Sequence, residues 1–289
     1  MYKKTPAGDR LALVGDSQGI LDIGGGKTAQ GGGVPAAFLA TFNTALAPQF
    51  LVQLGDGTID QSTHAVAFDK NNDLIITGNT KGAINFPGGP MLTPAGTQAA
   101  FVAKIKGDGS GTAWAKLYGS GTAGGEGVAT DAKGDIYVTG DHQGDIDFGN
   151  GVLGNKFGAN VFVAHLEGGG NAVWSKSFGD STSQHAHGIV VDAMGRLIVA
   201  GQYSGKIDFG DGELTSAGND DAFVAKLDTH GCQVWAKSFG DPMLQAINAI
   251  ALDPSGNTTL AGNFQGGVMF GSTTLTAQGD DIFVTKIAP

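Results

Sequence analysis

The sequence predicts an all-β fold built from five repeated units of about sixty residues, and three observations support this prediction. The first is a segment of the type Phe-Val-Ala-Lys, whose five copies are spaced by 60 to 63 residues. The copies begin at Phe38, Phe101, Phe162, Phe223 and Phe283. The second is the placement of 50 glycines between short apolar runs of strand length. The third is that no useful length of the chain shows helical periodicity.

The first two strands of each unit are predicted to form a β-hairpin. In the fourth unit an apolar segment ends at Asp192, a turn through Gly195 follows, and a second segment rich in β-branched residues begins after it. The same Asp-x-x-Gly turn occurs in two further units, at 131–134 and 253–256. In the second unit Asn72 takes the place of the glycine, because Asn tolerates positive φ.

The third strand is the Phe-Val-Ala-Lys segment, and a glycine-rich turn such as 106–111 leads from it to a fourth strand. The fourth strand carries an aromatic residue at one repeated position. These residues are Phe50, Trp114, Trp174 and Trp235. Strand alternation puts Trp114 and Lys116 on one face and the small Ala113 and Ala115 on the other. We therefore expect the rings to pack between neighbouring sheets rather than to stack on sugars.

Between its second and third strands each unit inserts about twenty residues, most clearly at 204–215. Apolar positions lie on both sides of a glycine turn in this segment. We interpret it as a small additional hairpin that projects from one face of the molecule. It recurs near Ile20, Ile84, Ile146 and Val268.

Four-stranded units repeated in this way are typical of a β-propeller, so we predict five blades in one domain over residues 1–289. The repeats cover roughly 1–55, 56–119, 120–179, 180–240 and 241–289. Only three strand signals are present in the fifth unit. The segment Tyr2-Lys3-Lys4 is either a remnant of the first strand or a copy of the fourth strand that closes the ring. One strand is missing in both cases, and the exposed edge could contact another chain.

The segments 188–192, 197–201, 221–228 and 234–237 together resemble the SBBP-type β-propeller repeat of bacterial secreted and surface-attached proteins. The resemblance covers nearly the whole chain and implies a propeller fold in an extracellular or cell-surface setting. It implies little about chemistry, because most of the family is uncharacterised. The family is named for seven blades, and the five units of this chain depart from that number.

Composition excludes several classes of partner. The net charge is −10 and the lysines are spread along the chain, which disfavours nucleic acid and anionic membranes as partners. No apolar run approaches the length of a membrane helix. The N-terminus has no apolar segment of a signal peptide, so secretion would require an export signal that has been removed. The single cysteine, Cys232, excludes an internal disulfide.

One position of the repeat is polar in four units and varies among them. Counting back from the turn aspartate gives His64, Glu126, His187 and Asn248, which we call the polar column. At the start of an innermost strand these side chains would surround the mouth of the central channel, where they could bind a polar ligand or a metal ion. His185 would face the same way. The alternative is that they are polar only because propeller channels are wet.

A second candidate site is a group of carboxylates in the fourth unit. Its members are Asp208, Asp211, Glu213, Asp220 and Asp221. Oxygen ligands at such close spacing suit Ca²⁺, which is the cofactor that the sequence favours, although no EF-hand loop is present. The alternative is that Asp residues favour turns because their side chains bond to the local backbone.

The sequence favours a non-catalytic recognition or scaffold module that binds carbohydrate or protein through its recurring loops, since similar units give similar sites. The alternative is a glycan-processing enzyme, a hydrolase or lyase, with its site at the channel mouth. A third hypothesis is a purely structural ring within a longer surface protein.

Overall fold

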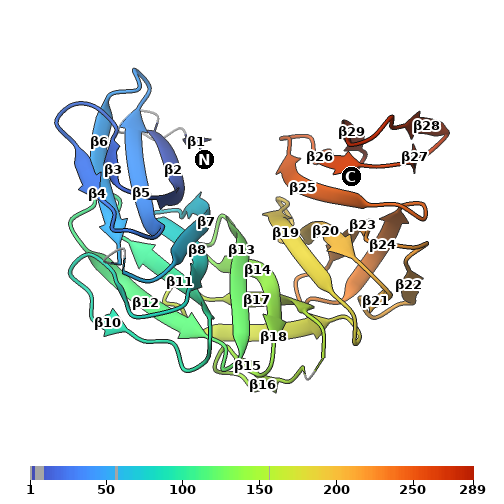
Figure 1. Ribbon diagram of the computed structural model, residues 1–289, viewed down its shortest axis with the longest axis horizontal. Helices are drawn as coiled ribbons and strands as arrows, with labels where there is room; N and C mark the ends of the chain where they lie inside the picture. Colours follow the sequence, from blue (N-terminus) through green and yellow to red (C-terminus); the bar gives the residue numbers. More distant parts are fainter. Residues whose placement is uncertain (1, 4–9, 56–57, 156) are drawn as a thin grey trace. The chain divides into compact units, whose positions relative to one another are not determined.

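The computed structural model describes residues 2–3, 10–55, 58–155 and 157–289. Every helix or strand in this part of the chain is a β-strand, so the prediction of an all-β fold is confirmed. The strands form five antiparallel blades, one for each repeat, and the fold is a five-bladed β-propeller. Figure 1 labels these strands and colours them from blue in the first sheet to red in the fifth. The described residues include no helix able to cross a membrane.

The five sheets follow the repeats in the sequence. Sheet one has the order β1 (Tyr2–Lys3), β2 (Arg10–Ser17), β5 (Ala36–Asn43) and β6 (Pro48–Leu54). Sheet two has the order β7 (Gln61–Phe68), β8 (Leu74–Thr80), β11 (Ala99–Ile105) and β12 (Thr112–Tyr118). Sheet three has the order β13 (Thr122–Thr130), β14 (Ile136–Gln143), β17 (Asn160–Leu166) and β18 (Ala172–Phe178). Sheet four has the order β19 (Gln184–Val191), β20 (Leu197–Tyr203), β23 (Asp221–Leu227) and β24 (Gln233–Phe239).

Sheet five has three strands in the described part of the chain. They are β25 (Gln245–Leu252), β26 (Thr258–Phe264) and β29 (Asp281–Ile287), in that order. At the other end of the chain, β1 pairs with β2 and so takes the first-strand position of sheet one. Of the two interpretations of Tyr2-Lys3-Lys4, this pairing favours the remnant of a first strand for Tyr2 and Lys3. Lys4 lies outside the described residues.

A small hairpin lies between the second and third strands of every repeat, as the sequence predicts. In the first two repeats the hairpins are β3 (Ile20–Asp22) with β4 (Thr28–Gln30) and β9 (Ile84–Asn85) with β10 (Met91–Leu92). The third repeat has β15 (Ile146–Asp147) with β16 (Val152–Leu153). The last two have β21 (Lys206–Asp208) with β22 (Glu213–Thr215) and β27 (Gly267–Phe270) with β28 (Thr273–Thr276).

The chain divides into two compact units, which comprise residues 1–136 with 167–171 and residues 137–166 with 172–289. Each unit has its own buried apolar cluster. In the first unit it includes Leu39, Phe86 and Phe101. In the second it includes Val224, Phe264 and Phe283. The phenylalanines of the Phe-Val-Ala-Lys segments are therefore core residues. That residues 1–289 form a single domain stays a prediction.

Asp69 organises the turn that joins β7 to β8. Its Oδ1 accepts the backbone N–H groups of Asn71 and Asp73 at 2.8 and 2.9 Å. Asn72 has a φ of 67°, which confirms that it takes the place of glycine in this turn. The glycines at the matching places of the later turns also have positive φ. The short turn therefore depends on a side-chain acceptor and on one left-handed residue.

The lysine of the Phe-Val-Ala-Lys segment binds the same turn aspartate. Lys104, on the third strand β11, places its Nζ 2.6 Å from Oδ2 of Asp69. The Asp69 side chain is only 2% exposed and that of Lys104 11%, so this is a buried ion pair. The matching pairs in sheets four and five are Lys226 with Asp192 (3.7 Å) and Lys286 with Asp253 (2.6 Å). The aspartate thus ties the third strand to the first hairpin.

The aromatic residue and the lysine of a fourth strand dock on the last turn of the following repeat. Trp114 Nε1 donates to the carbonyl of Gly168 at 3.2 Å, and Lys116 Nζ donates to that of Gly170 at 2.5 Å. A Cβ at position 170 would lie 2.9 Å from the Trp114 ring, so the close contact requires glycine. The matching contacts in the next repeat are Trp174 Nε1 with Thr229 O (3.0 Å) and Lys176 Nζ with Gly231 O (2.8 Å). The prediction that these rings pack between repeats is confirmed for Trp114 and Trp174.

We expect Asp69→Ala to lower the free energy of unfolding by about 3 kcal/mol, because it leaves Lys104 buried without its nearest carboxylate and the turn without its acceptor. Urea denaturation measures this change. Lys81→Ala is the control, since Lys81 pairs with Asp60 at 2.7 Å on the surface. That change should cost no more than about 1 kcal/mol. Equal losses in the two variants would contradict the importance given to the buried pair.

Candidate functional site

Three of the four residues of the polar column are the extra residue of a β-bulge. They are His64 in β7, His187 in β19 and Asn248 in β25, where the pairing register skips one residue. Glu126 occupies the corresponding place in the repeat, in β13. The prediction that the column lies at the start of the strand is wrong, because pairing with the second strand begins three residues before each bulge.

A glycine in the second strand makes room for each bulge. A Cβ at Gly201 would lie 2.0 Å from the carbonyl oxygen of His185, and a Cβ at Gly78 would lie 2.0 Å from that of Ser62. Gly262 is restricted in the same way. An interior strand glycine marks a bulge or a close backbone approach. This repeated glycine was the sequence signal that could have located the bulges.

The structure brings two members of the polar column together. His64 Nδ1 lies 3.0 Å from Glu126 Oε1 and 3.2 Å from the backbone carbonyl of Gly125. The side chains of His64 and Glu126 are 28% and 24% exposed, so both remain accessible to solvent. The hydrogen bond to Glu126 raises the pKa of His64, although burial acts in the opposite direction. The pair therefore favours an imidazolium beside a carboxylate.

The other two members of the column have different surroundings. His187 Nε2 is buried and has no hydrogen-bond partner among the described residues. Asn248 Nδ2 donates to Asn263 Oδ1 at 2.6 Å. His185 Nδ1 lies 3.2 Å from Asp141 Oδ1, a partner that the sequence analysis did not identify.

A histidine that is oriented by a carboxylate can hold or transfer a proton, and its second ring nitrogen can bind a polar group. Two such pairs lie on strands of the described residues, His64 with Glu126 in the first compact unit and His185 with Asp141 in the second. His187 and Asn248 also belong to the second unit. A single channel-mouth site that contains the whole polar column, and the enzyme hypothesis built on it, stay predictions.

The five carboxylates of the predicted calcium site are engaged in different ways. Two of the side chains accept a backbone N–H: Asp208 from Gly210 at 2.7 Å and Asp221 from Ala217 at 3.0 Å. Two others have a side-chain partner: Glu213 pairs with Lys206 at 2.7 Å, and Asp220 accepts from Gln202 at 3.0 Å. Asp211 provides a backbone carbonyl to Gln233. Burial raises the pKa of Asp221, which makes this carboxylate a poorer cation ligand. Among the described residues no three His, Cys, Asp or Glu side chains are grouped to hold a metal ion, and calcium binding stays a prediction.

The small hairpins that the sequence predicts between the second and third strands present a third candidate site. Each hairpin has one apolar cross-strand pair directed inward, such as Ile84 with Leu92. The adjacent cross-strand pair is exposed in every hairpin, and we call these residues the outward pairs. They are Asp22 with Thr28, Asn85 with Met91, Asp147 with Val152, Asp208 with Glu213, and Met269 with Thr274. The inward pairs are always apolar, whereas the outward pairs differ from repeat to repeat.

Comparison with known proteins supports the fold but gives no activity. No protein-family model matches the chain. The chain is similar to an uncharacterized WD repeat-containing protein of Acanthamoeba polyphaga mimivirus, with 26% identity over 155 residues. The match covers 47% of this chain and 11% of that protein, so the chain spans only a small part of its relative. Fold and similarity together define the chain as a β-propeller repeat protein.

We expect the pKa of His64 to lie above 6.5 and to fall toward that value in Glu126→Gln. A pKa that is raised in the folded state stabilises the fold below the unfolded-state pKa, and this contribution is lost as the pH rises through the folded-state pKa. The stability advantage of the wild type over Glu126→Gln should therefore be largest below pH 6.5 and should shrink as the pH rises through the folded-state pKa of His64. NMR titration of the imidazole and urea denaturation at each pH measure the two effects. An unchanged His64 pKa in the variant would contradict the pairing.

We expect Gly201→Ala to lower the free energy of unfolding by about 2 kcal/mol or more, because its Cβ would collide with the His185 carbonyl at the bulge. Gly169→Ala is the control, since a Cβ there meets nothing within 4 Å. Its stability should stay within about 0.5 kcal/mol of the wild type. Similar midpoints of urea unfolding for the two variants would show that the bulge tolerates a side chain.

Proposed function

We propose that this β-propeller is a binding module that acts as a protein-interaction scaffold, with the outward pairs of its hairpins as the contact residues. The observation that carries the proposal is the contrast between the two pairs in each hairpin. The inward pair keeps its apolar character in every repeat, because it anchors the hairpin to its blade. The outward pair differs from repeat to repeat, and its exposed side chains are not fixed by packing against the blade.

The chemistry of the outward pairs suits a protein ligand. Met91 and Met269 are 67% and 60% exposed, and Val152 is 62% exposed. Methionine adapts its shape to a partner surface, and exposed apolar side chains bordered by polar ones are typical of interaction sites. Asp147 and Asp208 add negative charge to two of the hairpins, so a partner with basic side chains would be favoured.

Several finer features belong to the same proposal. The resemblance to SBBP-type repeats supports a bacterial protein that works outside the cell or at its surface, where carbohydrate would be an additional ligand. The carboxylates at 208–221 support calcium binding in the fourth repeat. A rise in the thermal unfolding midpoint with Ca²⁺, reversed by EDTA, would support that ion, and an unchanged midpoint would exclude it.

A double variant tests the role of the outward pairs. We expect Met91→Asp with Met269→Asp to weaken binding to any protein that the wild type recognises on a protein array by about tenfold or more. The inward pairs are unchanged in this variant, so its unfolding midpoint should match that of the wild type. Met194→Asp is the matched control, because Met194 is 71% exposed but lies outside the hairpins.

Three outcomes would count against the proposal. The first is equal binding by the double variant and the wild type. The second is an equal loss of binding in Met194→Asp, which would assign the effect to charge alone. The third is recognition of glycans on a parallel glycan array with no protein bound, which would replace the protein ligand with carbohydrate.

A further inference from the structure

The loop of the third hairpin contains a chemically labile dipeptide. Asp147 of β15 pairs with Val152 of β16, so residues 148–151 form the loop between the two strands. This loop contains Asn150 and Gly151, the single Asn-Gly dipeptide of the sequence. Both residues are exposed, and Gly151 has a φ of 124°. Because glycine has no Cβ, its backbone nitrogen is open to attack the side-chain amide of the asparagine before it.

Both reacting groups of this dipeptide are hydrogen-bonded to side chains of the second compact unit. The backbone N–H of Gly151 donates to Asp147 Oδ1 at 3.2 Å, and the N–H of Gly149 holds the same oxygen at 2.7 Å. The side-chain oxygen of Asn150, Oδ1, accepts from the Ser175 hydroxyl at 2.9 Å. A carboxylate can take the proton of an attacking nitrogen, and a donor at this distance stabilises the negative charge that forms on the carbonyl oxygen. The loop therefore has a base beside the nucleophile and a donor beside the electrophile.

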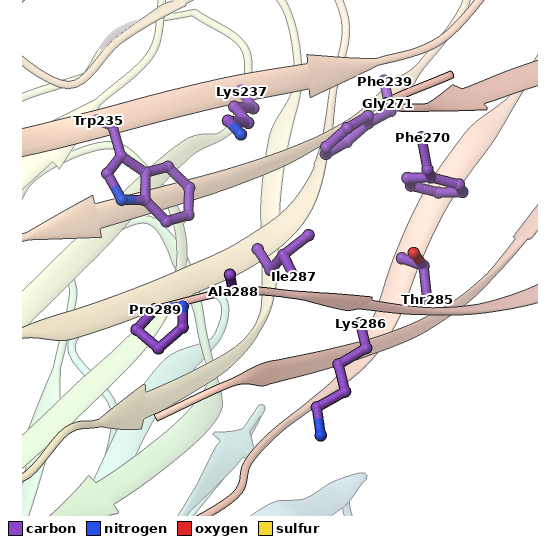
Figure 2. A pocket seen from close by; sticks show the side chains of 10 residues that line it. All are labelled: Trp235, Lys237, Phe239, Phe270, Gly271, Thr285, Lys286, Ile287, Ala288 and Pro289. Atoms are coloured by element: carbon purple, nitrogen blue, oxygen red, sulfur yellow. The ribbon is translucent and has the colours of Figure 1, made fainter. Parts of the chain in front are cut away.

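The serine that donates to this amide occurs in the third repeat and not in sheets two and four. Ser175 lies on β18, between the tryptophan and the lysine that dock on the next repeat. The matching residues are Ala115 in β12 and Ala236 in β24. Figure 2 shows Trp235 and Lys237 on the same side of β24, so the residue between them is directed to the other side. Among these three sheets the hydroxyl is thus present in the one whose hairpin carries the Asn-Gly dipeptide.

We propose that Asn150 is a self-modification site, at which the side-chain amide is lost as ammonia without the help of another protein. The backbone nitrogen of Gly151 attacks Cγ of Asn150 and gives its proton to Asp147. The Ser175 hydroxyl donates to Oδ1, on which negative charge develops. The proton then passes to Nδ2, the bond between Cγ and Nδ2 breaks, and ammonia leaves behind a cyclic imide. Water opens this ring at either carbonyl group and gives aspartate or isoaspartate at position 150. The inference goes beyond the proposed function, because no partner takes part in the reaction.

The fourth repeat already carries the aspartate product in its own sequence. Residues 147–151 read Asp-Phe-Gly-Asn-Gly, and residues 208–212 read Asp-Phe-Gly-Asp-Gly. The two segments differ only by Asn150 against Asp211, and both glycines have positive φ in each of them. A carboxylate is therefore accommodated at this place, and the aspartate product adds one negative charge to the third hairpin on an unchanged backbone. The isoaspartate product differs, because it lengthens the main chain of the loop by the Cβ atom.

A comparison of rates tests whether the fold promotes the reaction. The intact protein and a synthetic peptide of residues 145–154 are incubated in the same neutral buffer, and mass spectrometry measures the loss of the amide at Asn150. The peptide contains Asp147 without its fixed position and lacks Ser175. We expect the folded protein to lose the amide about tenfold faster than the peptide or more. This readout depends on no variant.

Two variants assign the roles of the neighbouring side chains. Ser175→Ala should slow the reaction by about tenfold, because it removes the donor to the amide oxygen. Asp147→Asn keeps an acceptor oxygen for the Gly151 N–H but takes no proton, so it should slow the reaction by a similar factor, about tenfold. Ser177→Ala is the matched control on the same strand, since the Ser177 hydroxyl contacts His142 instead. Its rate should equal that of the wild type.

Three results would overturn the proposal. The first is a folded protein that loses the amide of Asn150 no faster than the peptide does. The second is a wild-type rate in either Ser175→Ala or Asp147→Asn. The third is a loss of rate in Ser177→Ala as large as that in Ser175→Ala, which would assign the effect to the stability of the strand rather than to the hydrogen bond.

Discussion

The carboxylate of a turn aspartate is the group on which sheet two depends, and its pairing with a lysine recurs in sheets four and five. In Asp69 one oxygen holds the backbone of the turn between the first and second strands, and the other binds Lys104 of the third strand. Three strands are thus fixed by one side chain that is removed from solvent. A buried charge is tolerated only when its hydrogen bonds and its counter-charge are both provided, which explains why Asp and Lys occur together in sheets two and four. The matching pair in sheet five, Lys286 with Asp253, is more exposed.

Contacts between successive repeats reuse a single arrangement. A ring and a lysine from one fourth strand bind the carbonyl groups of the following turn, as Trp114 does with Gly168 and Trp174 with Thr229. The stability of a repeat protein is approximately the sum of such nearest-neighbour terms. A propeller assembled in this way can vary its surface residues freely, provided that the turn glycine and the docking ring are retained.

Local features could be predicted from the sequence, and features that depend on a partner strand could not. The turn at Asp69, including the left-handed Asn72, follows from residue chemistry over four positions. The bulge at His187 was missed because it arises from the mismatch between two strands, although Gly201 marked it. The pairing of His185 with Asp141 was missed for a related reason, since it joins residues 44 positions apart in the sequence. The carboxylates at 208–221 are grouped by proximity in sequence alone. The backbone partners of Asp208 and Asp221 match the alternative that Asp side chains bond to the local backbone, whereas the side-chain partners of Glu213 and Asp220 lie further away in the sequence.

The bulges also determine how the polar column can evolve. The extra residue stands outside the ladder of paired backbone groups, so a histidine can be exchanged there for an asparagine without changing the register of the strand, as positions 187 and 248 illustrate. Loss of the residue would also keep the register, because the residues on either side of the bulge already pair with consecutive residues of the second strand, as Thr63 does with Gly78 and Ala65 with Thr77. The first strands β7, β19 and β25 therefore each contain one position that can be exchanged or removed without a change of register, and diversity among paralogues or in an engineered library can accumulate there.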